Sequence, residues 1–162
     1  MTPPHAKTWS PRGRTPVVRV RGRSRRSISI AALTCCYKPG HRPRLIYRPR
    51  HDDGRRDGRK SFSWRDYRDL LIAAHHQLGG PIVLIWDNLN VHKAAGLREF
   101  AVSRVWLTIY YLPPYTPDLN PVEGIWSLLR RGWLSNVAFS TPEHLVQRIR
   151  RGLRHIQPQR PH

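Results

Sequence analysis

The sequence has few cysteines, few acidic residues and no long apolar run. Its two cysteines are adjacent, at Cys35 and Cys36, and neighbouring cysteines rarely form a disulfide. Because no C-x-x-C pair is present, we expect neither a disulfide framework nor a zinc site, and we expect a reducing, cytoplasmic compartment. The longest apolar runs are far shorter than the roughly 20 residues that span a bilayer. Met1 is followed by Pro, His, Lys and Arg and not by the apolar core of a signal peptide, so no membrane association is expected.

Basic residues outnumber acidic ones almost three to one. The chain has 29 Lys and Arg against 10 Asp and Glu, a formal net charge of +19. Residues 1–60 carry 17 of the basic residues and three of the acidic ones. A field of this sign attracts polyanions, and nucleic acid is the commonest of these partners. The alternative is a basic fragment whose charge is balanced by sequence that lies elsewhere.

Three parts follow one another along the chain. Residues 1–26 form a basic segment rich in Pro, Gly and Arg, which predicts mostly loop. Residues 27–157 have the patterns of one folded domain, and residues 158–162 are a short tail. The basic segment is either a solvated loop or an arm that contacts phosphates. We expect DNA contact from its arginines, which are Arg19, Arg21, Arg23, Arg25 and Arg26.

The first half of the domain predicts two strands, a helix and a third strand. Residues 27–37 and 43–48 are β-prone and are separated by a turn, which predicts an antiparallel hairpin. Ser63 and Asp66 have the spacing of a capping box at the start of a helix. The continuous apolar run Ile82–Trp86 is typical of a strand that is buried on both faces.

The second half predicts a short helix over residues 94–103, a strand over 105–112 and two further helices. Asn120 caps the first of these helices, with Pro121 at its first helical position. The last helix covers residues 141–157 and places its arginines mostly away from its apolar face. These basic residues are Arg148, Arg150, Arg151 and Arg154. The predicted order from residue 27 is β-β-α-β-α-β-α-α.

Two carboxylates occupy positions that suit metal-ion chemistry. Asp87 ends the predicted strand Ile82–Trp86, and Glu123 lies in the first turn of the helix that Asn120 caps. Phosphoryl transfer uses two Mg²⁺ ions roughly 4 Å apart, held by a few carboxylates on rigid elements that converge. Each residue also has a plain structural interpretation. Asp87 suits an Asx-turn, and Glu123 suits a capping box with Asn120, so the residues alone leave these alternatives open.

Two segments resemble a known family closely. They are Trp86-Asp87-Asn88-Leu89-Asn90-Val91-His92 and residues 112–126, LPPYTPDLNPVEGIW. Both resemble the DDE transposases of the insertion-sequence-630/mariner superfamily. The resemblance implies an α/β, ribonuclease-H-like fold, which is a mixed sheet flanked by helices. It also implies DNA as the partner, both transposon ends and target, a homodimer, and a nucleoid-associated location in a bacterium.

The resemblance also assigns roles to particular residues. Asp87 and Glu123 would be the catalytic ligands of Mg²⁺ or Mn²⁺. Asn88, His92 and Asn120 would line the site. The basic segment and the arginines of the last helix would hold DNA by its phosphates.

Two features of the family have no match in the sequence. The family's first Asp lies on a strand upstream of the region that matches residues 2–9, and its helix-turn-helix region is also absent. We therefore expect the first, central strand of the sheet to be missing, which would leave its two neighbours without ladder partners. We expect the chain to be inactive alone and to need a companion N-terminal chain, a fused product or an earlier start.

The sequence thus predicts a fragment of a transposase catalytic domain. The intact parent would carry out Mg²⁺-dependent strand cleavage and strand transfer at transposon ends. The alternative is a non-catalytic basic DNA-binding module or regulator derived from a transposase. A different nuclease of the same fold, such as a resolvase, is disfavoured by the Pro-rich block over residues 113–126.

Overall fold

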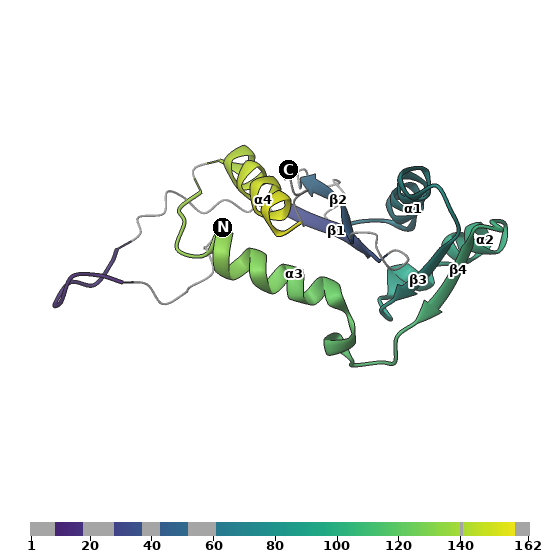
Figure 1. The fold of residues 1–162 in the computed structure, drawn as a ribbon, viewed down its shortest axis with the longest axis horizontal. Coiled ribbons are helices and arrows are strands. Elements are labelled where there is room, and N and C mark those ends of the chain that lie inside the picture. The colour runs from purple at the N-terminus through teal and green to yellow at the C-terminus, as the bar shows by residue number, and fades with distance from the viewer. Residues whose placement is uncertain (1–8, 18–27, 37–42, 52–60, 140, 158–162) are drawn as a thin grey trace.

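The computed structural model describes residues 9–17, 28–36, 43–51, 61–139 and 141–157. In this part of the chain the strands are β1 (Ile28–Cys35), β2 (Arg44–His51), β3 (Ile82–Trp86) and β4 (Leu107–Tyr111). The α-helices are α1 (Trp64–Leu78), α2 (Ala95–Val102), α3 (Pro121–Leu129) and α4 (Pro142–Ile156). The predicted order β-β-α-β-α-β-α-α is confirmed (Figure 1). None of the described helices is long and apolar enough to cross a membrane.

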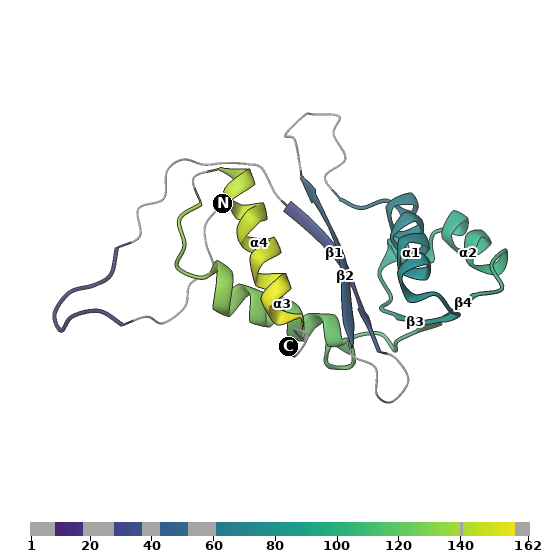
Figure 2. The ribbon, with the colours of Figure 1, turned by 45° about the horizontal axis from the view of Figure 1, so that its top comes forward.

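The strands form two separate pairs in the described part of the chain. β1 and β2 form an antiparallel hairpin in which Ile28 lies opposite His51. β3 and β4 are parallel, with Trp86 opposite Tyr111. The described residues therefore contain an antiparallel sheet and a parallel sheet in place of the single mixed sheet that was expected. The hairpin lies between the α3–α4 pair and the unit built from α1, α2, β3 and β4 (Figures 1 and 2).

Three apolar clusters hold these elements together. The first joins α1 and α2 to β3 and β4, and it includes Leu71 and Leu97, which are almost fully buried. The second packs the hairpin on α3 and α4 around Leu153. The third joins the hairpin to α1 through Ile46 and Leu70. The hairpin is thus the layer that connects the two halves of the molecule.

One expectation about β3 is wrong. Leu84 and Trp86 are buried, as predicted, because α1 and α2 cover their face of the strand. Val83 and Ile85 point to the opposite face and are 67% and 63% exposed. The strand is therefore buried on one face only, and its other apolar face is open.

Local capping signals hold in the structure. Ser63 and Asp66 form the predicted capping box, in which the Ser63 N–H donates to Asp66 Oδ2 at 2.7 Å. Arg50 of β2 pairs with the same carboxylate at 3.0 Å and so ties the hairpin to the start of α1. Three short elements were not predicted. They are 3₁₀ turns over Asn90–Lys93 and Pro117–Leu119 and a π-helical turn over Arg130–Leu134 that continues α3.

Gly152 marks a close approach between α4 and the end of α3. A Cβ at this position would lie 2.7 Å from Leu129 Cδ1 and 2.8 Å from Trp133 Cγ. Replacing Gly152 by Ala should therefore lower the free energy of unfolding by about 1–3 kcal/mol through overpacking. Gly124→Ala is the matched control, because a Cβ there meets no atom within 4 Å. It should instead stabilise α3 by about 0.5–1 kcal/mol, and urea unfolding of both variants checks the opposite signs.

Candidate active site

Asp87 follows β3 directly and is held by two neighbours. The Leu89 N–H donates to Asp87 Oδ1 at 3.3 Å, which is the Asx-turn that the sequence allowed. His92 Nδ1 lies 2.7 Å from the same oxygen. The side chain of Asp87 remains 36% exposed. Both contacts therefore fix the carboxylate from one side and leave it accessible.

His92 is the most enclosed polar side chain near Asp87. Its ring stacks on Trp86 at 4.1 Å between centroids and meets Tyr67 edge-on at 4.7 Å. Nε2 is buried and has no hydrogen-bond partner among the residues that the structure describes. Because only Nδ1 has an acceptor, the neutral ring carries its proton on Nδ1 and donates it to Asp87.

Burial and the nearby carboxylate act in opposite directions on the pKa of His92. Burial lowers this pKa, and the negative charge of Asp87 and the hydrogen bonds to it raise it by a smaller amount. The net shift is downward, so the imidazole is neutral at pH 7. Burial, followed by the charges of Asp87 and Asp66, raises the pKa of Tyr67. Its phenol therefore stays protonated beside the carboxylate.

The side chain of Asn88 bonds to the backbone of a neighbouring strand end and not to Asp87. Its Nδ2 donates to the C=O of Leu112, just beyond β4. The Leu112 N–H donates in turn to the Trp86 C=O at 2.7 Å. These two bonds clamp the ends of β3 and β4 together and so fix the point from which Asp87 projects.

Glu123 is placed by the start of α3. Asn120 Oδ1 accepts the Val122 N–H at 3.2 Å, and Pro121 occupies the first helical position, as predicted. The Asn120 N–H donates to the Pro117 C=O at 2.9 Å. The 3₁₀ turn Pro117–Leu119 thus already uses the Asn120 N–H, which the side chain of Glu123 would bind in a capping box. The side chain of Glu123 is therefore not needed for capping.

One groove brings the two carboxylates to the same cavity. It has a volume of about 790 Å³, and its walls come from β1, α1, β3 and residues 119–126. Asp87, His92, Asn120 and Glu123 all line it, whereas Asn88 does not. The groove is therefore the place where the chain can combine two acidic side chains with a buried histidine.

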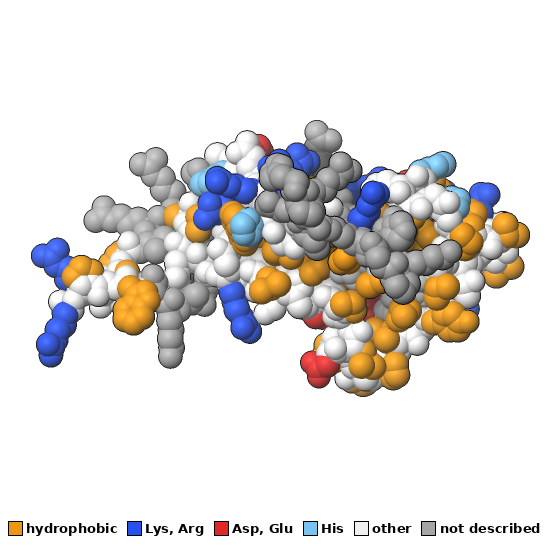
Figure 3. All heavy atoms as spheres, in the orientation of Figure 1, with side chains coloured by type: hydrophobic (Ala, Val, Ile, Leu, Met, Phe, Trp, Pro, Cys, Tyr) orange, Lys and Arg blue, Asp and Glu red, His pale blue; other side chains and the backbone are white. Residues whose placement is uncertain are grey.

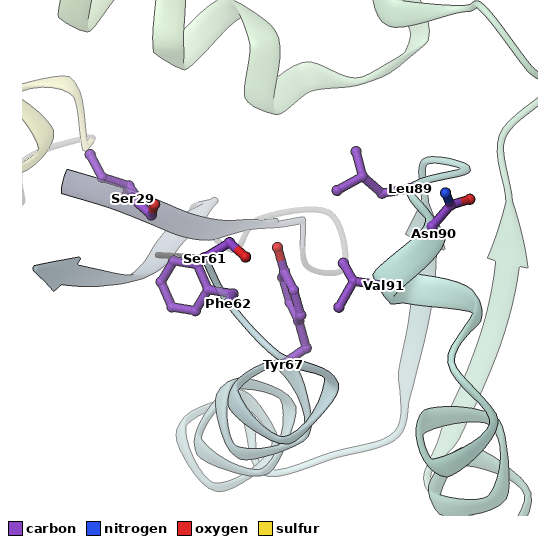
Figure 4. Close-up of a pocket in the computed structure, with 8 residues that line it drawn as sticks. Ser29, Ser61, Phe62, Tyr67, Leu89, Asn90 and Val91 are labelled. Atoms are coloured by element: carbon purple, nitrogen blue, oxygen red, sulfur yellow. The ribbon is translucent and has the colours of Figure 1, made fainter. Parts of the chain in front are cut away.

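A smaller pocket of about 580 Å³ lies at one end of this groove. It is bounded by Ser29 of β1, by Phe62 and by the segment Leu89–Val91 (Figure 4). The Tyr67 hydroxyl points into the space between β1 and this segment (Figure 4). No sequence signal marks the Tyr67 hydroxyl, because its role depends on where the loop after β3 folds.

The donor set suits a hydrated divalent cation. Asp87 and Glu123 offer carboxylate oxygens, the ligands that Mg²⁺ prefers, and Mg²⁺ is commonly held by one or two carboxylates together with waters and phosphate oxygens. Within the described residues, no group of three or more His, Cys, Asp or Glu could hold a metal. The residues thus fit an open, two-carboxylate site and not a closed cage.

The predicted DNA-binding arginines divide into three groups. Those of the basic segment, from Arg19 to Arg26, lie outside the described residues. On α4, three arginines are exposed, and they are Arg150, Arg151 and Arg154. Arg148 is half-buried, donates through Nε to the Trp133 C=O at 3.1 Å and lies over the Trp133 ring. Arg148 thus helps to pack α4, and the exposed three form the basic surface of this helix.

The fold and the groove define an α/β domain with one acidic residue at the end of a parallel strand and another at the start of a helix. A family model described as DDE superfamily endonuclease matches residues 58–146. This region is more than half of the chain and contains both Asp87 and Glu123. The chain belongs to the DDE superfamily endonucleases, which confirms the family expected from the sequence. Members of this superfamily generally use divalent metal ions.

Two relatives show similarity over part of the chain. The "Uncharacterized protein y4pE/y4sA" of Sinorhizobium fredii is 45% identical over 68 residues, which is 42% of this chain and 47% of that protein. The "Insertion element IS630 uncharacterized 39 kDa protein" of Shigella sonnei is 25% identical over 87 residues, 54% of this chain and 25% of that protein. The matches thus span under half the length of each relative.

A solved structure also aligns with the chain. It is the cryo-electron-microscopy structure of the simian T-cell lymphotropic virus intasome in complex with PP2A regulatory subunit B56 gamma. The alignment has a TM-score of 0.41 and 17% identity, and it covers 86% of this chain and 53% of that chain.

The titration of His92 provides a test of this geometry. The folded-state pKa of His92 is below the ordinary value of 6.5. At any pH between these two pKa values, the unfolded chain therefore binds more protons than the folded chain. The contribution of this group to stability is therefore complete above pH 6.5 and is lost as the pH falls towards the folded-state pKa. Asp87→Asn removes the anion that raises the pKa and should lower it further. NMR titration of the His92 ring checks both shifts, and a folded-state pKa at or above 6.5 would contradict the burial and contacts described.

Proposed function

We propose that this chain is part of a transposase catalytic domain, whose complete assembly cleaves DNA strands at transposon ends and joins them to a target. The observation that carries the proposal is the single groove lined by Asp87 and Glu123 within the DDE endonuclease region, residues 58–146. The similarity to a protein of insertion element IS630 supports the same function. Residues 27–157 would form the catalytic domain.

Asp87 and Glu123 would hold the divalent cation. When bound there, Mg²⁺ or Mn²⁺ would stabilise charge on the phosphate and lower the pKa of an attacking water. The protein's own residues prepare the site. The neutral His92 donates to Asp87 and keeps it oriented, while Asn120 begins α3 at the point that brings Glu123 to the groove.

DNA would be held by its phosphates. The formal charge of +19 attracts the polyanion. On α4, the exposed Arg150, Arg151 and Arg154 would contact the backbone, and the arginines from Arg19 to Arg26 would add further phosphate contacts. Transposon ends and target would both be bound in this way, by a homodimer or by an assembly with a companion chain.

The site of the chain alone would be incomplete. Two carboxylates come from β3 and α3, and the described residues offer no third ligand beside them. A first, central strand of the sheet would supply it. This same observation favours an alternative function, a non-catalytic DNA-binding module or regulator, for the chain in isolation.

Strand cleavage tests whether the chain acts alone. Incubated with supercoiled plasmid DNA and Mg²⁺ or Mn²⁺, the 162-residue polypeptide should produce no nicking above that of Asp87→Asn, because the described residues offer no third ligand beside the two carboxylates. Gel electrophoresis of the plasmid measures the nicked fraction. Robust nicking by the wild type that Asp87→Asn abolishes would show that two carboxylates suffice.

DNA binding separates the two candidate functions. For a catalytic domain, Mg²⁺ should tighten binding to a fluorescent duplex several-fold, because Asp87 and Glu123 would hold the cation and the cation would add attraction for phosphate. Asp87→Ala and Glu123→Ala should both remove this effect. Asp118→Ala is the matched control, since Asp118 is exposed and does not line the groove. Binding that ignores Mg²⁺ in the wild type and in all three variants would favour the non-catalytic module.

A further inference from the structure

Tyr115 combines a strained backbone with a fully exposed ring. Its φ is +59°, in the left-handed region that bulky residues rarely adopt. Among the described residues, Asn136 is the other non-glycine residue with positive φ, and asparagine tolerates this conformation. The Tyr115 side chain is 101% exposed. An exposed tyrosine alone is ordinary, but here a strained backbone holds the ring in solvent and gains no packing in return.

The turn that carries Tyr115 is stiffened by its neighbours. Pro114 and Tyr115 occupy its two central positions. A positive φ at the second of these positions is that of a type II turn, where Gly or Asn is usual. Thr116 Oγ1 donates across the turn to the Pro113 C=O at 2.7 Å, and each of the prolines, Pro117 included, fixes its own φ. The ring therefore projects from a segment with little conformational freedom.

Both ends of this segment are anchored at the candidate site. At one end, the Leu112 N–H donates to the C=O of Trp86, the last residue of β3. At the other end, the 3₁₀ turn Pro117–Leu119 leads directly into α3. Leu112 and Leu119 both line the groove, whereas Tyr115 does not. The ring thus stands at the rim of the groove, on the segment that crosses from β4 to α3 (Figure 1).

The chemistry of this position suits a nucleobase. The formal charge of +19 favours a polyanion as the partner, and aromatic side chains stack on the flat faces of bases whatever the sequence. Hydrophobic side chains lie over the β3–β4 end of the molecule and around the start of α3 in the view of Figure 3, so a base at this rim would leave water. Within a duplex, neighbouring bases cover both faces of each base. Only an unpaired base or a base at a duplex end can therefore stack on Tyr115.

We propose that Tyr115 stacks on an unpaired nucleobase of the DNA strand whose phosphate is held at Asp87 and Glu123. The placement of this strand rests on the proposed function. Leu112 is three residues from Tyr115, at most about 11 Å along an extended chain, and nucleotides of one strand are spaced by about 3.4 Å. The stacked base therefore belongs to a nucleotide within a few positions of that phosphate. The strain at Tyr115 is kept because Gly, which would relax the turn, has no ring.

DNA with an unpaired end tests the stacking. Two fluorescent duplexes carry a three-nucleotide extension, made either of thymidines or of abasic residues, in a 3′ and a 5′ version. Because both extensions have the same phosphates, the ratio of their affinities isolates the bases. Fluorescence anisotropy in Mg²⁺-free buffer should show that the 162-residue chain binds the thymidine extension about tenfold more tightly. Equal binding of thymidine and abasic extensions in both versions would overturn the proposal.

Variants of two exposed tyrosines identify the ring that stacks. Tyr115→Ala should remove the preference for thymidines, and Tyr115→Phe should keep it, because the ring face and not the hydroxyl makes the contact. Tyr110→Ala is the matched control and should keep the preference, since Tyr110 is 60% exposed but lies on β4, outside the strained turn. The proposal fails if Tyr115→Phe loses the preference as fully as Tyr115→Ala does, or if Tyr110→Ala loses it.

Replacing Tyr115 by Gly gives a second readout. Gly adopts a positive φ without strain, so Tyr115→Gly should have a higher urea midpoint of unfolding than Tyr115→Ala. It should also lose the preference for thymidines. Higher stability together with lost stacking is the result expected of a ring that is kept for binding. If both variants instead unfold at lower urea concentrations than the wild type, the ring supports the fold and the proposal is wrong.

Magnesium separates this proposal from the proposed function. A preference for thymidines without any effect of Mg²⁺ on duplex binding would support the stacking and would count against the metal site. An Mg²⁺ effect that Asp87→Ala removes, without a preference for thymidines, would support the metal site and overturn the stacking. Self-association of the chain that Tyr115→Ala abolishes, again without the preference, would also overturn it, because a second copy would then cover the ring.

Discussion

The parallel pairing of β3 with β4 is the constraint on which the candidate site depends. Two hydrogen bonds close the end of this strand pair. The Leu112 N–H donates to the Trp86 C=O, and Asn88 Nδ2 donates to the Leu112 C=O. These bonds fix the last residue of β3, so Asp87 projects from a rigid point. The same segment then turns through the Asx-turn at Asp87 into the 3₁₀ turn that brings His92 back under the carboxylate. A carboxylate on a loose loop would not keep a fixed distance from Glu123, which lies in the first turn of α3.

Electrostatics inside the groove differ from those of the molecule as a whole. The chain carries a formal charge of +19, yet its groove concentrates two carboxylates beside a histidine that burial keeps neutral. A protonated His92 would offset the charge of Asp87 and weaken its attraction for a cation. The stacking of the His92 ring on Trp86 thus preserves the negative charge of the site, because it holds the imidazole where desolvation favours the neutral form. The basic surface and the acidic groove suit the two needs of a nuclease, phosphate binding and cation binding.

Signals carried by neighbouring residues predicted much of this arrangement. The capping residues Ser63 and Asn120 and the apolar run of β3 depend on local chemistry, and the structure has their elements at the predicted places. The roles of Tyr67 and of the Asn88 amide could not be predicted, because they depend on partners far along the chain. The three short turns were also missed, since two precede and one continues a helix of ordinary pattern.

The error about β3 is informative for a physical reason. A continuous apolar run indicates a strand covered on both faces, but Val83 and Ile85 are exposed here. Their backbone groups also point away from β4, because those of Ile82 and Trp86 bond to the β4 side and backbone groups alternate in direction along a strand. A strand with both an uncovered apolar face and an unused edge costs solubility and stability unless something covers it.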